Sequence, residues 1–262
     1  MQDQERRLGG IRRLYGEKAV EKFLRSHVCV IGIGGVGSWA AEALARSGIG
    51  QLTLIDLDNV AESNVNRQAH AVSGEFGKAK ITAMHERVLL INPDCQVNEI
   101  EDFVTIDNLP EMLDRDYDFI IDCTDNFRTK AALIAYCKRN KLKVITIGGA
   151  GGQTDPTHIK VCDMKKTEHD GLLSQVRKLL RQKYDFPRNP KRRFYIPCVY
   201  SEEQLLYPTT DGGVCKEKPD GSNASGLNCE GGFGSVMTVT ATFGMAAVSH
   251  VLKKLASLPV PE

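Results

Sequence analysis

A glycine-rich run near residue 32 has the composition of a loop that holds phosphate groups. Residues 32–37 read G-I-G-G-V-G, and they follow an apolar run and precede a helix-like stretch. Glycines there permit a tight turn whose backbone N–H groups approach phosphate oxygens. Asp56 stands about 20 residues further on, after the next apolar run, where a carboxylate accepts hydrogen bonds from ribose hydroxyls. These features predict a nucleotide site, and an NAD enzyme would share them.

Charged side chains further along separate this site from that of a dehydrogenase. Arg67, Lys80 and Asp125 would neutralise the additional charge of a triphosphate, with Asp125 holding a magnesium ion, whereas a dinucleotide needs no metal. Four polar residues accompany them, namely Asp58, Ser63, Asn64 and Asn126. Asp58 and Ser63 fit the capping of a short turn equally well. Singly, the three charges fit surface ion pairs, but their joint occurrence predicts a triphosphate site.

The order and spacing of these residues between positions 28 and 147 resemble the ubiquitin-activating-enzyme-like (ThiF/MoeB-like) superfamily of adenylating enzymes. The resemblance implies ATP and Mg²⁺ as cofactors, Arg67, Lys80 and Asp125 as catalytic residues, and Asp125 as the metal ligand. Residues and resemblance together predict a cofactor-binding set of Gly32, Gly34, Gly35, Gly37, Asp56, Asp58, Ser63, Asn64, Arg67, Lys80, Asp125 and Asn126. Members of the superfamily convert a carboxylate to an acyl adenylate, whose AMP leaves readily.

The family pattern also includes an N-terminal arginine that reaches across a dimer into the partner's site. The opening of the chain resembles this pattern, with Arg7 at the first arginine and Gly10 in place of the second. Arg7 is therefore a candidate catalytic residue, Arg12 and Arg13 are alternatives, and a solvated basic face is the other interpretation. A homodimer is the expected assembly.

The C-terminal half distinguishes two branches of the superfamily. Protein-activating relatives carry a zinc lobe with CxxC pairs, whereas the eight cysteines here stand singly. Cys198, Cys215 and Cys229 are candidate nucleophiles or, alternatively, small packed residues. Segments 13–16, 32–48, 131–137, 148–153 and 239–244 resemble the bacterial tRNA threonylcarbamoyladenosine dehydratases. That resemblance implies activation of the threonyl carboxylate of the modified adenosine, followed by cyclisation with loss of water.

Three other functions stay open. One is adenylation of the C-terminal carboxylate of a sulfur-carrier or ubiquitin-like protein, another is nucleotide sensing without turnover, and the last is an NAD dehydrogenase. A cysteine desulfurase or sulfur-acceptor partner and a monovalent cation in the C-terminal loop are further expectations from the relatives.

A basic segment fits a tRNA substrate despite a net charge of only +1 for the whole chain. Its cations are Arg177, Lys178, Arg181, Lys183, Arg188, Lys191, Arg192 and Arg193. Interleaved aromatic residues, Tyr184, Phe186, Phe194 and Tyr195, suit base stacking as the cations suit phosphates. A solvated amphipathic helix followed by a loop is the alternative interpretation.

The elements that must position these residues alternate between apolar runs and helix-period stretches, which is typical of an α/β, Rossmann-like, doubly wound and mostly parallel sheet with helices on both faces. The expected strands are 28–31, 52–55, 97–100, 119–122, 144–147 and 158–162. The expected helices are 38–46, 80–91, 109–114, 129–139 and 172–183. An irregular crossover run to residue 200 and a loop over 207–234 follow.

Three parts are predicted within one continuous domain, namely a helical arm over 1–27, an adenylation core over 28–152 and a C-terminal crossover extension over 153–262. Residues 233–252 approach membrane length, but their threonines and His250 favour a buried helix over membrane contact. The polar, basic start lacks the apolar stretch of a secretory signal, so we expect a cytoplasmic protein.

Overall fold

A seven-stranded sheet organises the computed structural model, which describes residues 2–114, 116–189, 191–209, 211–217 and 233–257. Its strands are β1 (His27–Ile31), β2 (Gln51–Ile55), β3 (Gln96–Ile100), β4 (Phe119–Asp122), β5 (Val144–Ile147), β6 (Ile159–Asp163) and β7 (Pro197–Ser201). Their spatial order is β3-β2-β1-β4-β5-β7-β6, and only the β6–β7 pair is antiparallel. The predicted α/β class with a mostly parallel sheet is confirmed.

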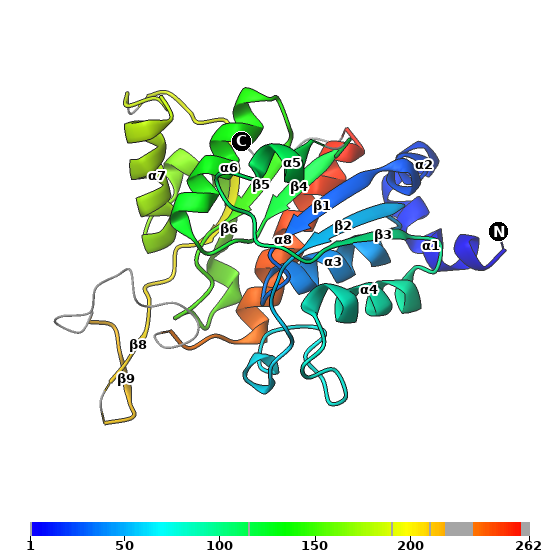
Figure 1. Cartoon of the computed structure of the whole chain (residues 1–262), viewed down its shortest axis with the longest axis horizontal. Helices are drawn as coiled ribbons and strands as arrows, with labels where there is room; N and C mark the ends of the chain where they lie inside the picture. The colour runs from blue at the N-terminus through cyan, green and yellow to red at the C-terminus, as the bar shows by residue number, and fades with distance from the viewer. Residues whose placement is uncertain (1, 115, 190, 210, 218–232, 258–262) are drawn as a thin grey trace.

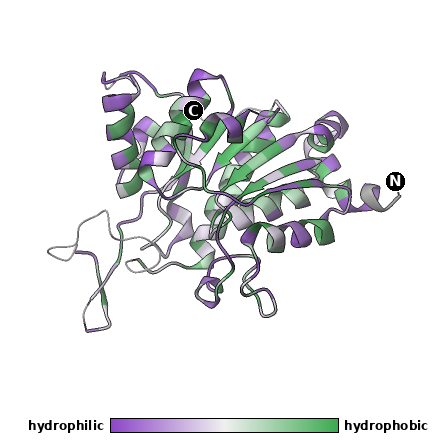
Figure 2. Cartoon of the chain, viewed as in Figure 1, coloured by the Kyte–Doolittle hydropathy of each residue, from purple (hydrophilic) through white to green (hydrophobic). Residues whose placement is uncertain are grey.

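Helices cover both faces of the sheet (Figure 1). One face packs against α3 (Gly37–Arg46), α4 (Lys80–Ile91) and α8 (Met237–Leu255), and the other against α5 (Leu109–Leu113), α6 (Phe127–Arg139) and α7 (Gly171–Lys183). Side chains of β1 alternate between the two cores, with Val28 and Val30 in the first and Cys29 and Ile31 in the second. Figure 2 shows the central strands as apolar along their length, as expected for strands covered on both faces.

The N-terminal arm consists of α1 (Gln2–Tyr15) and α2 (Glu17–Arg25). Val20 and Phe23 of α2 are fully buried against the first core, and Tyr15 packs edge-on against Phe23. Three 3-10 turns complete the helical content of the described chain, η1 (Glu62–Asn64), η2 (Pro156–His158) and η3 (Met164–Lys166).

The sheet reverses its direction of winding between β1 and β4, which are neighbours in space although two strands separate them in sequence. Ligands of doubly wound sheets bind at the carboxyl ends of the strands beside such a reversal. The glycine-rich run follows β1, and the segment with Asp125 follows β4. The topology therefore brings these two predicted parts of the site to one edge.

Two predictions about the C-terminal half were wrong. The run to residue 200 was expected to be irregular, but it ends in β7, which pairs with β5 and β6. Pro197 obscured this strand, since proline lowers strand propensity although it is accepted as the first residue of a strand. The expected loop over 207–234 includes the paired strands β8 (Tyr207–Pro208) and β9 (Val214–Cys215), and position 210 and positions 218–232 of it lie outside the described residues.

The last helix, α8, begins four residues later than its apolar run and continues to Leu255. Val239, Phe243 and Val251 are fully buried against the sheet, in agreement with the predicted buried helix. In the part of the chain that the structure describes, no helix combines the length and apolarity needed to cross a membrane.

Candidate functional site

The glycine-rich run forms a tight turn that only glycine fits at two positions. Gly32 has a positive φ of 86°, and a Cβ on it would lie 3.0 Å from the Cys123 carbonyl oxygen. A Cβ on Gly37 would lie 1.8 Å from the Gly32 carbonyl oxygen. The turn leads directly into α3, in whose first turn the Ser38 N–H donates to the Gly34 carbonyl at 3.1 Å. N–H groups at such a helix start can approach phosphate oxygens, and the phosphate-binding role of this turn stays a prediction.

Asp56 joins this turn to the end of β2. Its Oδ2 accepts a hydrogen bond from the Ile33 N–H at 2.6 Å, and its Oδ1 accepts one from the Asp58 N–H at 2.9 Å. Each carboxylate oxygen keeps a second lone pair, which can accept a ribose hydroxyl. Burial raises the pKa of Asp56, and the nearby positive charge of Lys80 acts in the opposite direction.

Lys80 is held at the first residue of α4 by the segment that follows β2. Its backbone N–H donates to the Asp58 carbonyl at 2.9 Å, and Asn59 pairs with Ala79 in an antiparallel bridge. The Lys80 ammonium lies 2.7 Å from Asp58 Oδ2, and 8% of the Lys80 side chain is exposed. Asp58 therefore positions the lysine. The alternative in which Asp58 caps the following turn was wrong, since the N-cap of that turn, η1, is Ala61.

Arg67 lies against the glycine-rich turn at residues 32–37, which is called the phosphate turn below. A Cβ on Gly35 would lie 3.3 Å from Arg67 Cγ, so the arginine stem packs on that glycine. Arg67 Nη1 donates to the Ser63 carbonyl at 2.6 Å and to Asn66 Oδ1 at 3.0 Å. Neutral acceptors thus hold the guanidinium, and its charge remains available to an anion. The buried Asn64 side chain accepts the Ala61 N–H at 3.0 Å and shapes the loop.

Trp39 and Thr240 also contact this loop, and the sequence reasoning missed both. Trp39 Nε1 donates to the Arg67 carbonyl at 2.9 Å, and Thr240 Oγ1 lies 3.4 Å from the same oxygen. They fix the Arg67 backbone from α3 and from α8. No local sequence signal announces either contact, because the residues lie far apart along the chain.

The segment after β4 carries Asp125 and Asn126, and both are exposed. Asn126 Oδ1 accepts the N–H groups of Arg128 and Thr129 and caps α6. Its amide group therefore keeps its donors for a nucleotide. This segment contacts the phosphate turn, since the Cys123 N–H donates to the Ile31 carbonyl at 2.8 Å and the Cys123 carbonyl abuts Gly32.

Arg7 lies at the other end of α4 from Lys80. Arg7 Nη1 donates to the carbonyl of Ile91, the last residue of that 12-residue helix. Twelve residues span about 18 Å. The edge of the sheet at the carboxyl ends of β1, β2 and β4 is called the nucleotide edge. Arg7 is therefore away from the nucleotide edge of its own chain, and a role in catalysis requires a second copy of the chain.

The basic segment is divided between buried and exposed cations. Arg181 lies over the Phe194 ring at 5.3 Å, and Arg177 bonds the Thr167 hydroxyl, so both belong to the packing of α7. Burial lowers the pKa of Arg177. Arg193 is half-buried, and the exposed cations are Lys178, Lys183, Arg188, Lys191 and Arg192. Only these five offer an unobstructed charge to a phosphate backbone.

Base stacking on Phe186 and Phe194 was a wrong prediction. Both rings are buried, and they pack against each other with centroids 5.0 Å apart. They anchor the crossover segment on the second core, where their apolar surface is removed from water. Tyr195, with 76% of its surface exposed, is an aromatic residue of this segment that a base could reach, and Tyr184 is half-buried against the second core.

The cysteine nucleophile is disfavoured at two of its three candidate positions. Cys198 is fully buried in β7, and burial raises its pKa well above that of a free thiol. Cys215 is half-buried and donates to the Glu217 carbonyl at 3.1 Å. Cys229 lies outside the described residues.

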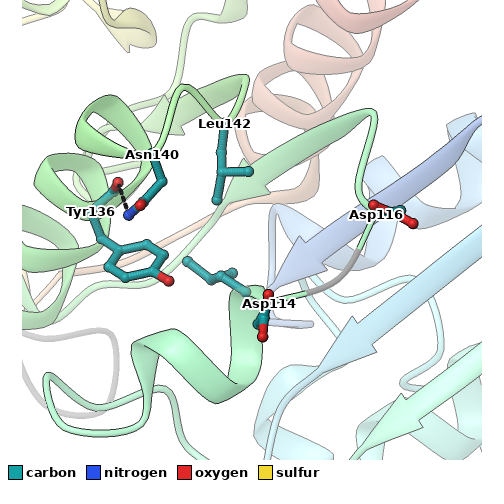
Figure 3. A pocket seen from close by; sticks show the side chains of 6 residues that line it. Asp114, Asp116, Tyr136, Asn140 and Leu142 are labelled. Carbon is teal, nitrogen blue, oxygen red and sulfur yellow. Dashed lines mark hydrogen bonds between the residues drawn. The ribbon is translucent and has the colours of Figure 1, made fainter.

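A cavity of about 510 Å³ opens at the opposite edge of the sheet (Figure 3). It is lined by Leu113, Asp114, Asp116, Tyr136, Asn140 and Leu142. These residues lie just before β4 and β5 or in the second half and C-cap of α6, away from the phosphate turn. Because it lies at the amino ends of β4 and β5 and the glycine-rich turn follows the carboxyl end of β1, the cavity is separate from the nucleotide site.

Known proteins resemble this chain over nearly its whole length. The model of the ThiF family matches residues 6–261. The tRNA threonylcarbamoyladenosine dehydratase of Haemophilus influenzae is 54% identical over 96% of this chain and 94% of its own length. The enzyme of the same name from Escherichia coli is 51% identical over 95% of this chain and 93% of its own length.

A solved structure extends the likeness to the fold. The Escherichia coli tRNA N6-threonylcarbamoyladenosine dehydratase, solved in complex with ATP, has a TM-score of 0.86 and 47% identity, covering 97% of this chain and 95% of its own. The resemblance inferred from the nucleotide residues and the C-terminal segments is thus confirmed. The chain belongs to the ThiF family and, within it, to the tRNA threonylcarbamoyladenosine dehydratases.

Proposed function

We propose that this chain is an ATP-dependent tRNA threonylcarbamoyladenosine dehydratase. The observation that carries the proposal is the end-to-end likeness, at about half identity, to two enzymes of that name and to an ATP complex of one of them. The geometry agrees with it, because Asp56 bonds the phosphate turn at Ile33, Arg67 packs against the turn at Gly35, and Lys80 pairs with Asp58, whose N–H is held by Asp56.

In the proposed reaction the threonyl carboxylate of the modified adenosine attacks the α-phosphorus of ATP, and pyrophosphate leaves. The carbamoyl group then attacks the activated carbonyl carbon and gives up a proton to solvent, and AMP leaves with the former carboxylate oxygen. The substrate has lost one water. Lys80 and Arg67 would stabilise the charge that moves onto the leaving pyrophosphate, and the N–H groups of the phosphate turn would orient the nucleotide.

The predicted magnesium ion fits the residues at Asp125. Asp125 is an exposed carboxylate at the nucleotide edge, and an oxygen ligand is what Mg²⁺ prefers. Within the described ranges, no group of three or more His, Cys, Asp or Glu side chains is placed to hold a metal. Magnesium commonly takes one or two carboxylates together with phosphates and water, so Asp125 would hold a metal–nucleotide complex. When bound, the ion would neutralise phosphate charge.

We also propose a homodimer in which Arg7 of one chain approaches the nucleotide edge of the other. The support is the placement of Arg7 on the exposed arm, about 18 Å along α4 from its own Lys80. The proposed tRNA surface comprises the exposed cations Lys178, Lys183, Arg188, Lys191 and Arg192. A cytoplasmic location is part of the proposal, because a tRNA substrate is available there. A sulfur-acceptor or cysteine desulfurase partner and a monovalent cation stay predictions from the sequence.

The decisive experiment incubates the purified chain with ATP, Mg²⁺ and tRNA that carries threonylcarbamoyladenosine. We expect AMP and pyrophosphate release, and a mass loss of one water in the digested nucleoside. An unchanged nucleoside during active nucleotide turnover would reject the substrate. Pyrophosphate exchange that depends on a small carrier protein instead of tRNA would favour the alternative activity. The Asp125→Ala variant is the matched control, and its retained activity would remove the metal role of Asp125.

A further inference from the structure

Lys130 is a buried cation directly below the nucleotide edge. It lies in the first turn of α6, and its ammonium is 2.8 Å from Oδ2 of Asp122, the last residue of β4. Both side chains are 0% exposed. Neither residue belongs to the predicted site. Each is a charged residue next to an apolar run, and this sequence signal could have drawn attention to the pair.

The polar groups around this pair satisfy one another completely. The ammonium donates to Asp122 Oδ2, to the Asp122 carbonyl at 3.3 Å and to Thr146 Oγ1 at 3.1 Å, which accounts for its three hydrogens. Thr146 in turn donates to Asp122 Oδ2 at 2.7 Å. Because Thr146 is the register partner of Asp122, the cluster ties β4, β5 and α6 together.

The second oxygen of Asp122 holds the segment that carries Asp125. Asp122 Oδ1 accepts the Thr124 hydroxyl at 2.7 Å and the Thr124 N–H at 3.1 Å. Residues 122–126 are thus bound at one end by the Lys130 cluster, and at the other by Asn126, which caps α6. The exposed Asp125 lies between these two anchors.

A buried ion pair is a weak device for stability, because the cost of removing two charges from water offsets their attraction. An apolar pair of similar volume would hold α6 on the sheet as well. What an apolar pair could not supply is the set of directed hydrogen bonds that fixes the backbone of residues 122–124.

We propose that Lys130 is a positioning residue, which through Asp122 and Thr146 fixes residues 122–126 so that the Asp125 carboxylate meets the metal–nucleotide complex. The inference rests on the proposed function only as far as the metal role of Asp125. Loosening the support of a metal ligand typically costs about 10- to 100-fold in metal affinity. The expected effect is therefore on metal-dependent nucleotide binding.

The test uses Thr146, because Lys130→Met leaves the Asp122 carboxylate buried without its charged partner and can prevent folding. Thr146→Val keeps the side-chain shape and removes the hydroxyl, and Thr146→Ser keeps the hydroxyl as the matched control. The affinity for α,β-methylene ATP is measured by calorimetry with Mg²⁺ and with EDTA. Asp125→Asn shows how much of the magnesium effect depends on that carboxylate.

Mg²⁺ should increase the nucleotide affinity of Thr146→Val about 10-fold less than it increases that of the parent. Affinity in EDTA should be unchanged in this variant. Thr146→Ser should match the parent in both conditions. If Asp125→Asn weakens the magnesium effect and Thr146→Val does not, the positioning role proposed for Lys130 through Thr146 is refuted. If Asp125→Asn has no effect either, the inference falls with its premise. No tRNA is present, so an error in the assigned substrate would leave these results unchanged.

Discussion

The Lys80 ammonium lies 2.7 Å from the carboxylate of Asp58, and the two residues are also joined by a backbone hydrogen bond of 2.9 Å. The lysine is nearly buried, whereas 54% of the Asp58 side chain is exposed. An ion pair with one hydrated partner contributes little to stability. The arrangement therefore holds the cation in one place at the nucleotide edge.

The first prediction follows from this asymmetry. Lys80→Met should lower the rate of ATP–pyrophosphate exchange about 10²- to 10³-fold, as expected for loss of one preorganised charge on a developing anion. The melting temperature should change little, because the exposed Asp58 carboxylate regains water. Exchange within a few-fold of the parent would exclude Lys80 from catalysis.

The second prediction separates the fold of the phosphate turn from its binding role. A Cβ on Gly34 would meet no protein atom within 4 Å, whereas a Cβ on Gly37 would lie 1.8 Å from the Gly32 carbonyl oxygen. Gly34→Ala should change the free energy of unfolding by less than about 0.5 kcal/mol. It should nevertheless weaken ATP binding, because the methyl group enters the space where phosphates approach the N–H groups.

Gly37→Ala should destabilise the protein by about 3 kcal/mol, since the backbone must move to admit the methyl group. Urea unfolding and calorimetric ATP binding of both variants provide the comparison. An ATP affinity in Gly34→Ala equal to that of the parent would mean that the phosphates lie elsewhere.

The sequence was most informative where local chemistry and position agreed. The positions of the glycine turn, Asp56 and Lys80 in the fold could be predicted because each follows or begins an element with a clear apolar pattern. The role of Asp58 could not, since turn capping and ion pairing require the same residue type. Which of the two occurs is decided by the Asn59–Ala79 bridge, a contact across the loop.

The basic segment shows the opposite limit. Its aromatic residues and cations suggest stacking and phosphate contacts when read in order, yet Phe186 and Phe194 are core residues. The same residue types occur in RNA-binding segments and in packed cores, and only the position of α7 against α6 decides between the two. Lys130 was missed for a related reason, because a lysine in the first turn of a helix is ordinarily exposed.

The third prediction concerns the exposed part of that segment. Replacing Lys183 and Lys191 with Gln should weaken tRNA binding and reduce the dependence of affinity on salt. The slope of the logarithm of the binding constant against the logarithm of the salt concentration should become about 1 less steep for each phosphate that a lysine no longer neutralises. ATP affinity should not change. Lys18→Gln and Lys22→Gln on the exposed side of α2 remove the same charge elsewhere and form the control. Equal effects of the two pairs would argue against a localised RNA surface.

The fourth prediction is a loss of stability in mild acid. Burial, followed by neighbouring positive charges, lowers the pKa of His70 and of His250 to about 4. The unfolded chain titrates its histidines near pH 6.5. Between about pH 6.5 and 4 the unfolded state therefore binds more protons, so the free energy of unfolding rises with pH in this window and is level above it. At about 1.4 kcal/mol for each pKa unit, His70 alone accounts for up to about 3 kcal/mol.

Urea unfolding at pH 7.5, 6.5, 5.5 and 5.0 measures this loss, and His250→Phe isolates its cause. Phe keeps a ring beside Phe119, which packs edge-on against His250 at 6.1 Å, but it does not titrate. The variant should therefore lose distinctly less stability between pH 6.5 and 5.0 than the parent does. The control matters because burial raises the pKa of Asp56 and Asp170, and raised carboxylate pKa values favour the native state as the pH falls. Identical pH profiles of parent and variant would assign the acid sensitivity to groups other than His250.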